Sequence, residues 1–500
     1  MQFQRLLLKQ SGARLWSQSQ RIVPSFPHSN YYLSQSNSRS STTLQLQYRS
    51  MSTSDVPNLF CSVGSDRKAI SDEQIRKHLS EFLNALGEKD EVLILPPDYT
   101  RLHSQAGKIT RMICEHYNFI PSQDSPQGQG EETKQKGPEI EIMPALGTHA
   151  PMTQDEILKM FGEELAKKSS SFLPHDWRND VVTIGEAPAE MVRKATHGVV
   201  DRPWPAQLNK KVWEKRQRPR SLVLSVGQVV PHEVMGMANF NKNLFVGTGG
   251  VKAINLSHFI GAVHGMENMM GRKSNPLRDI LNYASENFLE SQLDLWYILT
   301  VIAPDLSITG FYIGRDIECY SAACDLSMRV NFTVLDRPIK RCVAYMEPEE
   351  YHSTWVANKA IYRTRMAMAD GGKLTIIAPG VSRFGEDDKV SALIEKYGYL
   401  GTERTMKSME ENPELQENLS AVSHLIHGST EGRFDVTYCP GHLSEEQIEA
   451  VGFQYEDVNE VSQRYNVDQL MDGWHEDEEG EFYFISKPAL GLWTVESRLR

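Results

Sequence analysis

The chain has 500 residues, of which 40% are hydrophobic and 24% are charged, and its formal net charge is −12. This composition is typical of a soluble globular protein of two or three domains. The acidic balance argues against nucleic acid as a partner, because phosphate binding needs a basic surface. No stretch approaches the roughly 18–20 consecutive apolar residues of a membrane-spanning helix, so we expect no membrane partner.

The first 54 residues differ in composition from the rest of the chain. They contain six basic residues and no acidic one, they are rich in Ser and Gln, and their first leucines and cations alternate at helical spacing. These properties are typical of an organelle transit peptide, although a disordered tail would share them. We predict that residues 1–54 are a leader for the mitochondrion, or else the plastid, and that Met51 starts an untargeted form. The remaining chain carries a net charge of −18.

Helices and short apolar strands alternate in the next part of the chain. Residues 71–86 combine an N-cap serine, acidic residues in the first turn and helical apolar spacing, and a capping box opens a second helix at 154–162. Short apolar runs predict strands at 91–97, 139–146 and 221–230. The alternation predicts an α/β domain over residues 55–305, with a polar, mobile insertion at 121–137.

A second α/β domain is expected over residues 306–500. Strands are predicted at 308–314, 342–348 and 373–380, a helix at 353–370 and a turn between two strands at 472–484. The chain has six scattered cysteines without a CxxC pair. This spacing suits reduced core residues better than a zinc ribbon or a disulfide framework.

Polar residues follow three of the predicted strands, where α/β folds place their ligands. Asp98 and Arg101 follow the first strand, His149 follows the second, and His232 follows the third. Between the last two lies His175, and a glycine-rich run, 247–250, follows His232. Each residue alone fits a helix cap, a surface histidine or a tight turn. Together they suit a site with a metal or a general base and an anion-binding guanidinium.

Four segments occur in this order along the chain: DYTR, ALGTHAPMT, HDW and VVPHEVMGMANFNKNLFVGTGGVKAI. Through these segments the chain resembles the nickel-dependent lactate racemase family, over roughly residues 57–500. The resemblance implies an α/β fold class, with two α/β domains and the active site in the cleft between them. It also implies a nickel pincer nucleotide, pyridinium-3,5-bisthiocarboxylic acid mononucleotide, which holds nickel through sulfur, carbon and sulfur. One protein histidine completes the coordination of the metal.

The resemblance also assigns roles to individual residues of this chain. His232 would be the metal ligand, and His149 and His175 would be the paired acid/base histidines. Arg101 would act in catalysis and bind the substrate. The other assigned residues are Asp98 and Lys359 for substrate binding and Gly249, Gly250 and Lys252 for cofactor binding.

Some positions depart from the family pattern. The prototype anchors its cofactor through a lysine about ten residues after the HDW-type histidine, whereas this chain has Ile-Gly-Glu at 184–186, so we expect no lysine anchor. Val356 stands where the lactate enzyme has a glutamine. The second domain also offers additional polar and aromatic side chains, which favour a polyhydroxy acid: Trp355, Arg363, Arg365, His424, His427 and Arg433.

We therefore predict an isomerase that inverts C2 of a 2-hydroxy acid, either a sugar acid of the gluconate/mannonate type or a lactate-like acid, by hydride transfer to the nickel cofactor. The hydride route needs only a base on the hydroxyl and an electron acceptor. Two alternatives stay open. One is a zinc-dependent hydrolase or lyase with His149, His175 and His232 as ligands. The other is a non-catalytic relative that binds the nucleotide or a sugar acid.

Overall fold

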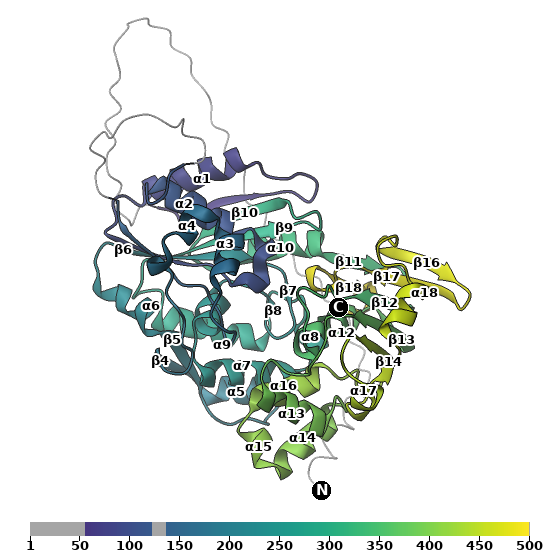
Figure 1. Cartoon of the computed structure of the whole chain (residues 1–500). Coiled ribbons are helices and arrows are strands. Elements are labelled where there is room, and N and C mark those ends of the chain that lie inside the picture. The colour runs from purple at the N-terminus through teal and green to yellow at the C-terminus, as the bar shows by residue number, and fades with distance from the viewer. Residues whose placement is uncertain (1–55, 123–136, 500) are drawn as a thin grey trace, which may run out of the picture. The chain divides into compact units, whose positions relative to one another are not determined.

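The computed structural model describes residues 56–122 and 137–499, which contain two six-stranded sheets with helices around them (Figure 1). The predicted leader, 1–54, and most of the predicted insertion lie outside the described residues. The α/β fold class expected from the sequence is confirmed.

The first sheet has the strand order β1-β10-β9-β6-β2-β3. Its strands β9, β6, β2 and β3 run parallel to one another. Strand β10 pairs antiparallel with β9, and β1 pairs antiparallel with β10. The strands are β1 Leu59–Gly64, β2 Glu91–Leu95, β3 Glu139–Ile142, β6 Ser221–Gln228, β9 Leu295–Ile302 and β10 Ile308–Gly314. The three strands predicted in the first domain are β2, β3 and β6, so their carboxyl ends meet at one edge of the sheet.

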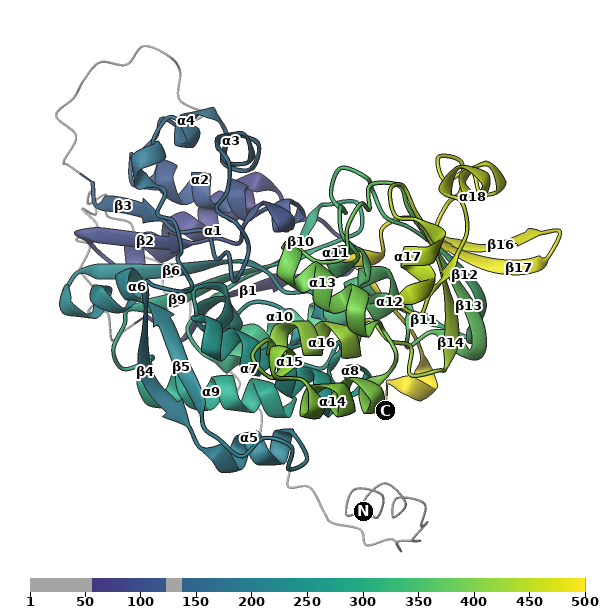
Figure 2. The ribbon, with the colours of Figure 1, turned by 60° about the horizontal axis from the view of Figure 1, so that its bottom comes forward.

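Helices cover both faces of this sheet (Figure 2). Alternate residues of a strand point to opposite faces, so Val92 and Ile94 pack beneath α1 (Asp72–Ala85) and α2 (Ala106–His116). Leu93 and Leu95 pack on the other face, in the core that includes α9 (Pro276–Phe288) and α10 (Ile317–Asn331). Burial on both faces explains why these strands are continuous apolar runs.

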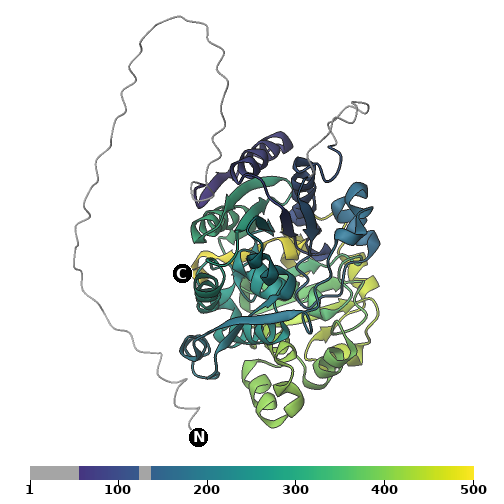
Figure 3. The ribbon, with the colours of Figure 1, turned by 90° about the vertical axis from the view of Figure 1, so that its left-hand side faces the viewer.

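The second sheet has the order β15-β14-β13-β12-β17-β16 and is parallel except for the β16–β17 hairpin, which confirms the predicted turn at 472–484. After this sheet the chain returns to pair β18 in parallel with β11, directly after α10 (Figure 1). The yellow C-terminal end therefore lies beside the teal part of the chain (Figure 3). The strands are β11 Phe332–Leu335, β12 Ile339–Tyr345, β13 Met368–Ala378, β14 Phe434–Pro440, β15 Gln454–Tyr455, β16 Gly473–Asp477, β17 Gly480–Ile485 and β18 Leu492–Val495.

Local sequence signals explain several helix ends. The predicted capping box from Thr153 to Glu156 opens α3, and the predicted N-cap Ser71 of α1 forms a capping box with Gln74. The remaining helices and strands are α3 Gln154–Phe161, α4 Glu163–Ala166, β4 Val181–Ala187, α5 Ala189–Ala195, β5 Trp204–Asn209, α6 Lys210–Glu214, β7 Pro231–His232, β8 Gly236–Met237, α7 Val251–His264, α8 Met266–Met269, α11 Thr354–Ala357, α12 Lys359–Thr364, α13 Asp388–Tyr397, α14 Thr402–Glu411, α15 Pro413–Gln416, α16 Leu419–His427, α17 Glu445–Ala450 and α18 Val458–Arg464.

Two expectations about the second half need correction. The expected domain boundary at 305/306 falls between β9 and β10, which are hydrogen-bonded neighbours in the first sheet, so the N-terminal half continues through α10. The expected helix at 353–370 ends at Thr364, and β13 already begins at Met368. The pairing of Met368 with Ile339 overrides the local helical spacing, because the apolar residues here suit a buried strand equally well.

All six cysteines are free and buried, as predicted. None of the helices in residues 56–122 and 137–499 is long and apolar enough to cross a lipid bilayer.

Candidate active site

A cavity of about 210 Å³ lies at the carboxyl ends of β2, β3 and β6. Its wall includes residues from the loops after these strands, and residues 350–362 from the C-terminal half close it from the other side. Parallel strands deliver their following loops to one edge of a sheet, so this location follows from the strand order. The cavity brings together five of the predicted site residues, namely Asp98, Arg101, His149, His232 and Lys359.

Asp98 and His149 form a carboxylate–imidazole pair in this cavity. His149 Nδ1 lies 2.6 Å from Asp98 Oδ2, and the Thr100 hydroxyl donates to Asp98 Oδ1 at 2.6 Å. Burial raises the pKa of Asp98, but the charge and hydrogen bond of His149 outweigh it, so the pKa is lowered and Asp98 is ionised. An ionised carboxylate can only accept, so Nδ1 donates, and Nε2 of His149 is left without a hydrogen-bond partner among the described residues.

His232 lies on β7 with its ring buried at the cavity wall. Its Nδ1 accepts hydrogen bonds from the backbone N–H groups of Val234 at 3.1 Å and Met235 at 3.4 Å. Burial, followed by the charges of Lys242 and other cations, holds the pKa of His232 well below its usual value, so the ring is neutral. Because Nδ1 accepts, the proton sits on Nε2, and a metal at Nε2 would have to displace that proton.

His175 does not line the cavity. It is buried, Asn209 Nδ2 donates to its Nδ1 at 3.0 Å, and its Nε2 donates to the carbonyl of Gly249 at 3.0 Å. Both ring nitrogens are therefore engaged, and burial lowers its pKa. In the described structure, His175 links the ends of β5 and the glycine-rich run.

The predicted cofactor residues also lie away from the cavity wall. A Cβ on Gly249 would come within 1.8 Å of the Phe245 carbonyl oxygen, and a Cβ on Gly250 would meet Gln207 Oε1 at 2.5 Å. Close packing of the backbone therefore accounts for both glycines. Lys252 is exposed on α7. Of the 247–250 run, Gly247 lines the cavity.

The substrate lysine predicted in the second half does reach the cavity. Lys359, at the start of α12, has its Nζ 5.5 Å from the centre of the Tyr351 ring. Burial, followed by the charge of Arg101, lowers its pKa. Val356, one turn earlier, lies in the same wall. Arg101 and Lys359 therefore approach one cavity from the two halves of the chain.

Sequence reasoning missed two cavity residues, Lys242 and His258. His258 Nδ1 donates to the Ile254 carbonyl at 2.8 Å, one helical turn earlier, so its Nε2 is unprotonated in the neutral ring. Burial lowers the pKa of His258. His258 lies six residues after Lys252 on α7, and nothing in its local sequence marks it as a site residue. Only the packing of α7 against the cavity brings it there.

The additional polar side chains of the second half are used in contacts within the protein. Arg363 is fully buried, donates to the Pro231 carbonyl and lies 3.6 Å from Glu233. His424 contacts the hydroxyls of Tyr362 at 3.0 Å and Tyr399 at 2.9 Å. Neither Arg363 nor His424 lines the cavity, so they do not offer donors there to a polyhydroxy chain.

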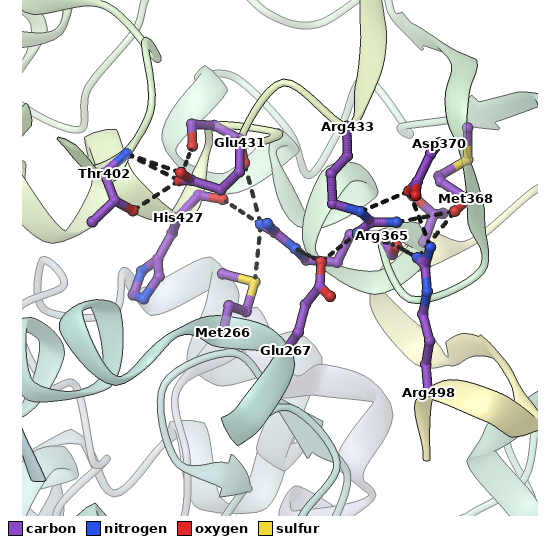
Figure 4. A network of polar contacts seen from close by, with 12 residues as sticks. Met266, Glu267, Arg365, Met368, Asp370, Thr402, His427, Glu431, Arg433 and Arg498 are labelled. Atoms are coloured by element: carbon purple, nitrogen blue, oxygen red, sulfur yellow. Dashed lines mark hydrogen bonds and ion pairs between the residues drawn. The ribbon is translucent and has the colours of Figure 1, made fainter. Parts of the chain in front are cut away.

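Arg365 and Arg433 belong to a second polar network (Figure 4). Both contact Glu267 of α8, which lies in the N-terminal half. Arg365 also donates to the carbonyl of His427 at 3.3 Å, and Arg433 pairs with Asp370 at 3.0 Å. The network joins α8 to the second sheet and does not reach the cavity wall.

The three histidines that the zinc alternative requires, His149, His175 and His232, do not come together in one site. His149 and His232 line the cavity but His175 does not, and the described residues contain no group of three or more His, Cys, Asp or Glu side chains that could hold a metal ion. A metal cofactor that supplies three donor atoms of its own needs only one ligand from the protein. His232 fits that requirement, because it is a single buried imidazole in the cavity wall.

Comparison with known proteins agrees with the resemblance. Residues 65–271 match the family model of the lactate racemase N-terminal domain. No curated protein sequence matches the chain.

Two solved structures share the fold. A crystal structure of a Thermotoga maritima protein is 22% identical, with a TM-score of 0.71, and the match covers 87% of this chain and all of that one. The lactate racemase apoprotein from Thermoanaerobacterium thermosaccharolyticum is 17% identical, with a TM-score of 0.62, and the match covers 86% of this chain and 93% of that one. Residues 65–271 therefore match a lactate racemase N-terminal domain, and the chain shares the fold of the lactate racemase apoprotein.

Proposed function

We propose that the protein is an isomerase that inverts the C2 carbon of a 2-hydroxy acid. The observation that supports this proposal best is the meeting of the Asp98–His149 pair with Arg101 and Lys359 in one cavity. Inversion next to a carboxylate needs a base for the hydroxyl proton and cations for the carboxylate. These residues supply both.

His149 would take the proton of the C2 hydroxyl on Nε2, while Asp98 holds the ring and stabilises the resulting imidazolium. Arg101 and Lys359 would bind the carboxylate from opposite sides and keep the C2 carbon in place while its configuration is lost. His149 would then return the proton to the hydroxyl oxygen of either enantiomer.

The hydrogen on C2 needs an acceptor that no side chain of the cavity provides. His232 would hold a nickel pincer nucleotide, which supplies a reversible hydride acceptor when it is bound. The anchoring lysine of the prototype has no counterpart at 184–186, so the cofactor would be held by this ligand and by non-covalent contacts.

The decisive experiment follows a panel of 2-hydroxy acids in deuterated water with purified, cofactor-loaded protein. We expect optical inversion with little deuterium at C2, because the hydrogen returns through the cofactor and not through solvent. Extensive deuterium incorporation would point to a proton-transfer isomerase. Absence of turnover with every acid, despite bound cofactor, would contradict the proposal and leave a binding protein.

The role of the second histidine can be tested in the same assay. His149→Ala should lower kcat by about 10²–10⁴-fold, the usual contribution of a positioned base. His258 lines the cavity with an unprotonated Nε2, so it is our candidate for a second base, and His258→Gln should lower kcat/KM equally in both directions because the equilibrium constant fixes their ratio. For His175→Gln we expect a lower melting temperature as the main effect. If His175→Gln abolishes turnover while the melting temperature stays normal, the result would support His149 and His175 as the acid/base pair, as predicted from the sequence.

A further inference from the structure

Three cationic side chains line the active-site cavity: Arg101, Lys242 and Lys359. No hydrogen bond or ion pair joins any of the three side chains to a carboxylate in residues 56–122 and 137–499. Three carboxylates also line the wall. Asp98 is engaged with His149 and Glu233 with Arg363, while the charge of Glu350 acts on Lys359 without forming an ion pair with it. The cavity therefore holds more unpaired cationic groups than a single carboxylate would occupy.

Lys242 is the most unusual of the three. Burial, followed by the nearby charge of Arg101, lowers the pKa of Lys242 to about 8. A lysine that merely covers apolar surface would extend its ammonium group into water or pair with an acid. Lys242 instead stands at the cavity wall beside another cation, which is unfavourable until an anion arrives.

The backbone around Lys242 is held in a costly conformation. Asn239 and Phe240 both have positive φ values, 65° and 59°, and a π-helix follows at Asn243–Gly247. Non-glycine residues with positive φ and π-helical turns both concentrate at functional sites. This conformation directs the chain so that Lys242 lies at the cavity wall.

Asparagine side chains secure this segment. Asn243 Nδ2 donates to the Leu95 carbonyl at 3.0 Å and to the Ser225 hydroxyl at 2.9 Å. Asn241 is hydrogen-bonded to the buried Arg278 and, at 2.7 Å, to Asn282. The segment is therefore fixed to the ends of β2 and β6, next to the Asp98 and His232 loops.

From this arrangement we infer that the substrate is a 2-hydroxy acid with a second anionic group, which is bound by Lys242, while Arg101 and Lys359 bind the carboxylate next to C2. A second anionic group would pair with Lys242, which a neutral polyhydroxy chain would leave without an ion-pair partner among the described residues. The inference rests on the proposed function and specifies its substrate class. The engagement of Arg363, Arg365 and His424 within the protein supports an anionic end group over a sugar-like one.

The test is calorimetric binding to the full chain at pH 7, with four acids as probes. Malate carries a second carboxylate, 3-phosphoglycerate carries a phosphate, lactate has no second polar group, and gluconate has a neutral polyhydroxy chain. We expect one or both dianions to bind at least about tenfold tighter than lactate and gluconate. The ratio of malate to 3-phosphoglycerate affinity identifies the second group as carboxylate or phosphate.

The matched variants are Lys242→Met and Lys242→Gln, with Lys211→Met as a control on the exposed surface of α6. Both Lys242 variants should reduce dianion affinity by about tenfold and leave lactate affinity within about twofold, at an unchanged melting temperature. The control should bind all four acids like the unaltered protein.

Three results would overturn the inference. The first is equal affinity for lactate and the dianions, the second is an equal loss of affinity for all four acids in the Lys242 variants, and the third is no measurable binding of any acid. Dianion selectivity without C2 inversion would contradict the proposed function alone, and inversion of lactate without selectivity would contradict this inference alone.

Discussion

The Asp98–His149 pair illustrates how a neighbour determines the role of a residue. The motif alone suggests that Asp98 binds substrate, but its carboxylate is buried and bonded to His149 and Thr100. A carboxylate in this position fixes the tautomer and orientation of the imidazole and stabilises its protonated form. Asp98 is therefore placed to position the base.

This assignment can be separated from substrate binding by kinetics. Asp98→Asn should lower kcat by about 10²-fold or more and change KM little, because the amide no longer stabilises the imidazolium. Thr100→Val, which removes only the second hydrogen bond of Asp98, serves as the milder control. A large rise in KM with kcat preserved would instead support direct contact between Asp98 and the substrate.

At the scale of elements, the glycine-rich run is determined by packing. Gly249 lies against the carbonyl of Phe245 in the π-helix, and its own carbonyl accepts from His175. The run therefore connects three elements, namely the π-helix, α7 and the end of β5. It is the contact distance at Gly249, and not a phosphate-binding loop, that requires a residue without a side chain.

Gly249→Ala should therefore destabilise the protein by about 1–3 kcal/mol, the usual cost of overpacking, because the new Cβ would meet backbone atoms that cannot rotate away. Thermal unfolding monitored by circular dichroism measures the change. Gly371→Ala is the comparison, since Gly371 has a φ of +72° but nothing within 4 Å of its Cβ position, so only conformational strain is added. If Gly249→Ala is as stable as the unaltered protein, the close approach is not a constraint.

At the scale of the whole molecule, buried histidines couple stability to pH. His424 and His427 lie in the core of the C-terminal half, and burial holds the pKa of His424 well below its usual value and lowers that of His427 to about 3. Both are neutral when folded but gain a proton near pH 6.5 when unfolded. Unfolding therefore takes up protons below that pH, and the folded state loses stability as the pH falls.

We expect the free energy of unfolding to fall between about pH 6.5 and pH 5, with each such histidine adding a slope of up to ~1.4 kcal/mol per pH unit. His427→Phe should flatten this dependence and raise stability at pH 5, since His427 Nε2 has no hydrogen-bond partner among the described residues. Urea unfolding across the pH range measures the effect, with the exposed His352→Ala as control. An unchanged slope in His427→Phe would show that another group dominates.

The sequence alone determined the features that depend on local pattern. Apolar runs located β2, β3 and β6, an N-cap serine with helical spacing located α1, and a capping box located α3. Polar residues after strands located Asp98, Arg101, His149 and His232, because parallel strands deliver their following loops to one edge. The ordered motifs indicated the lactate racemase N-terminal domain, whose family model matches residues 65–271.

The tertiary structure decided what depends on contacts between distant segments. In the tertiary structure β10 belongs to the first sheet, and the helix predicted at 353–370 ends early. His175 hydrogen-bonds to Gly249 outside the cavity, whereas Lys242 and His258 line the cavity. The tertiary structure also engaged the arginines of the second half in protein contacts. Burial, charge pairing and strand pairing are properties of neighbours in space, and local sequence spacing does not contain them.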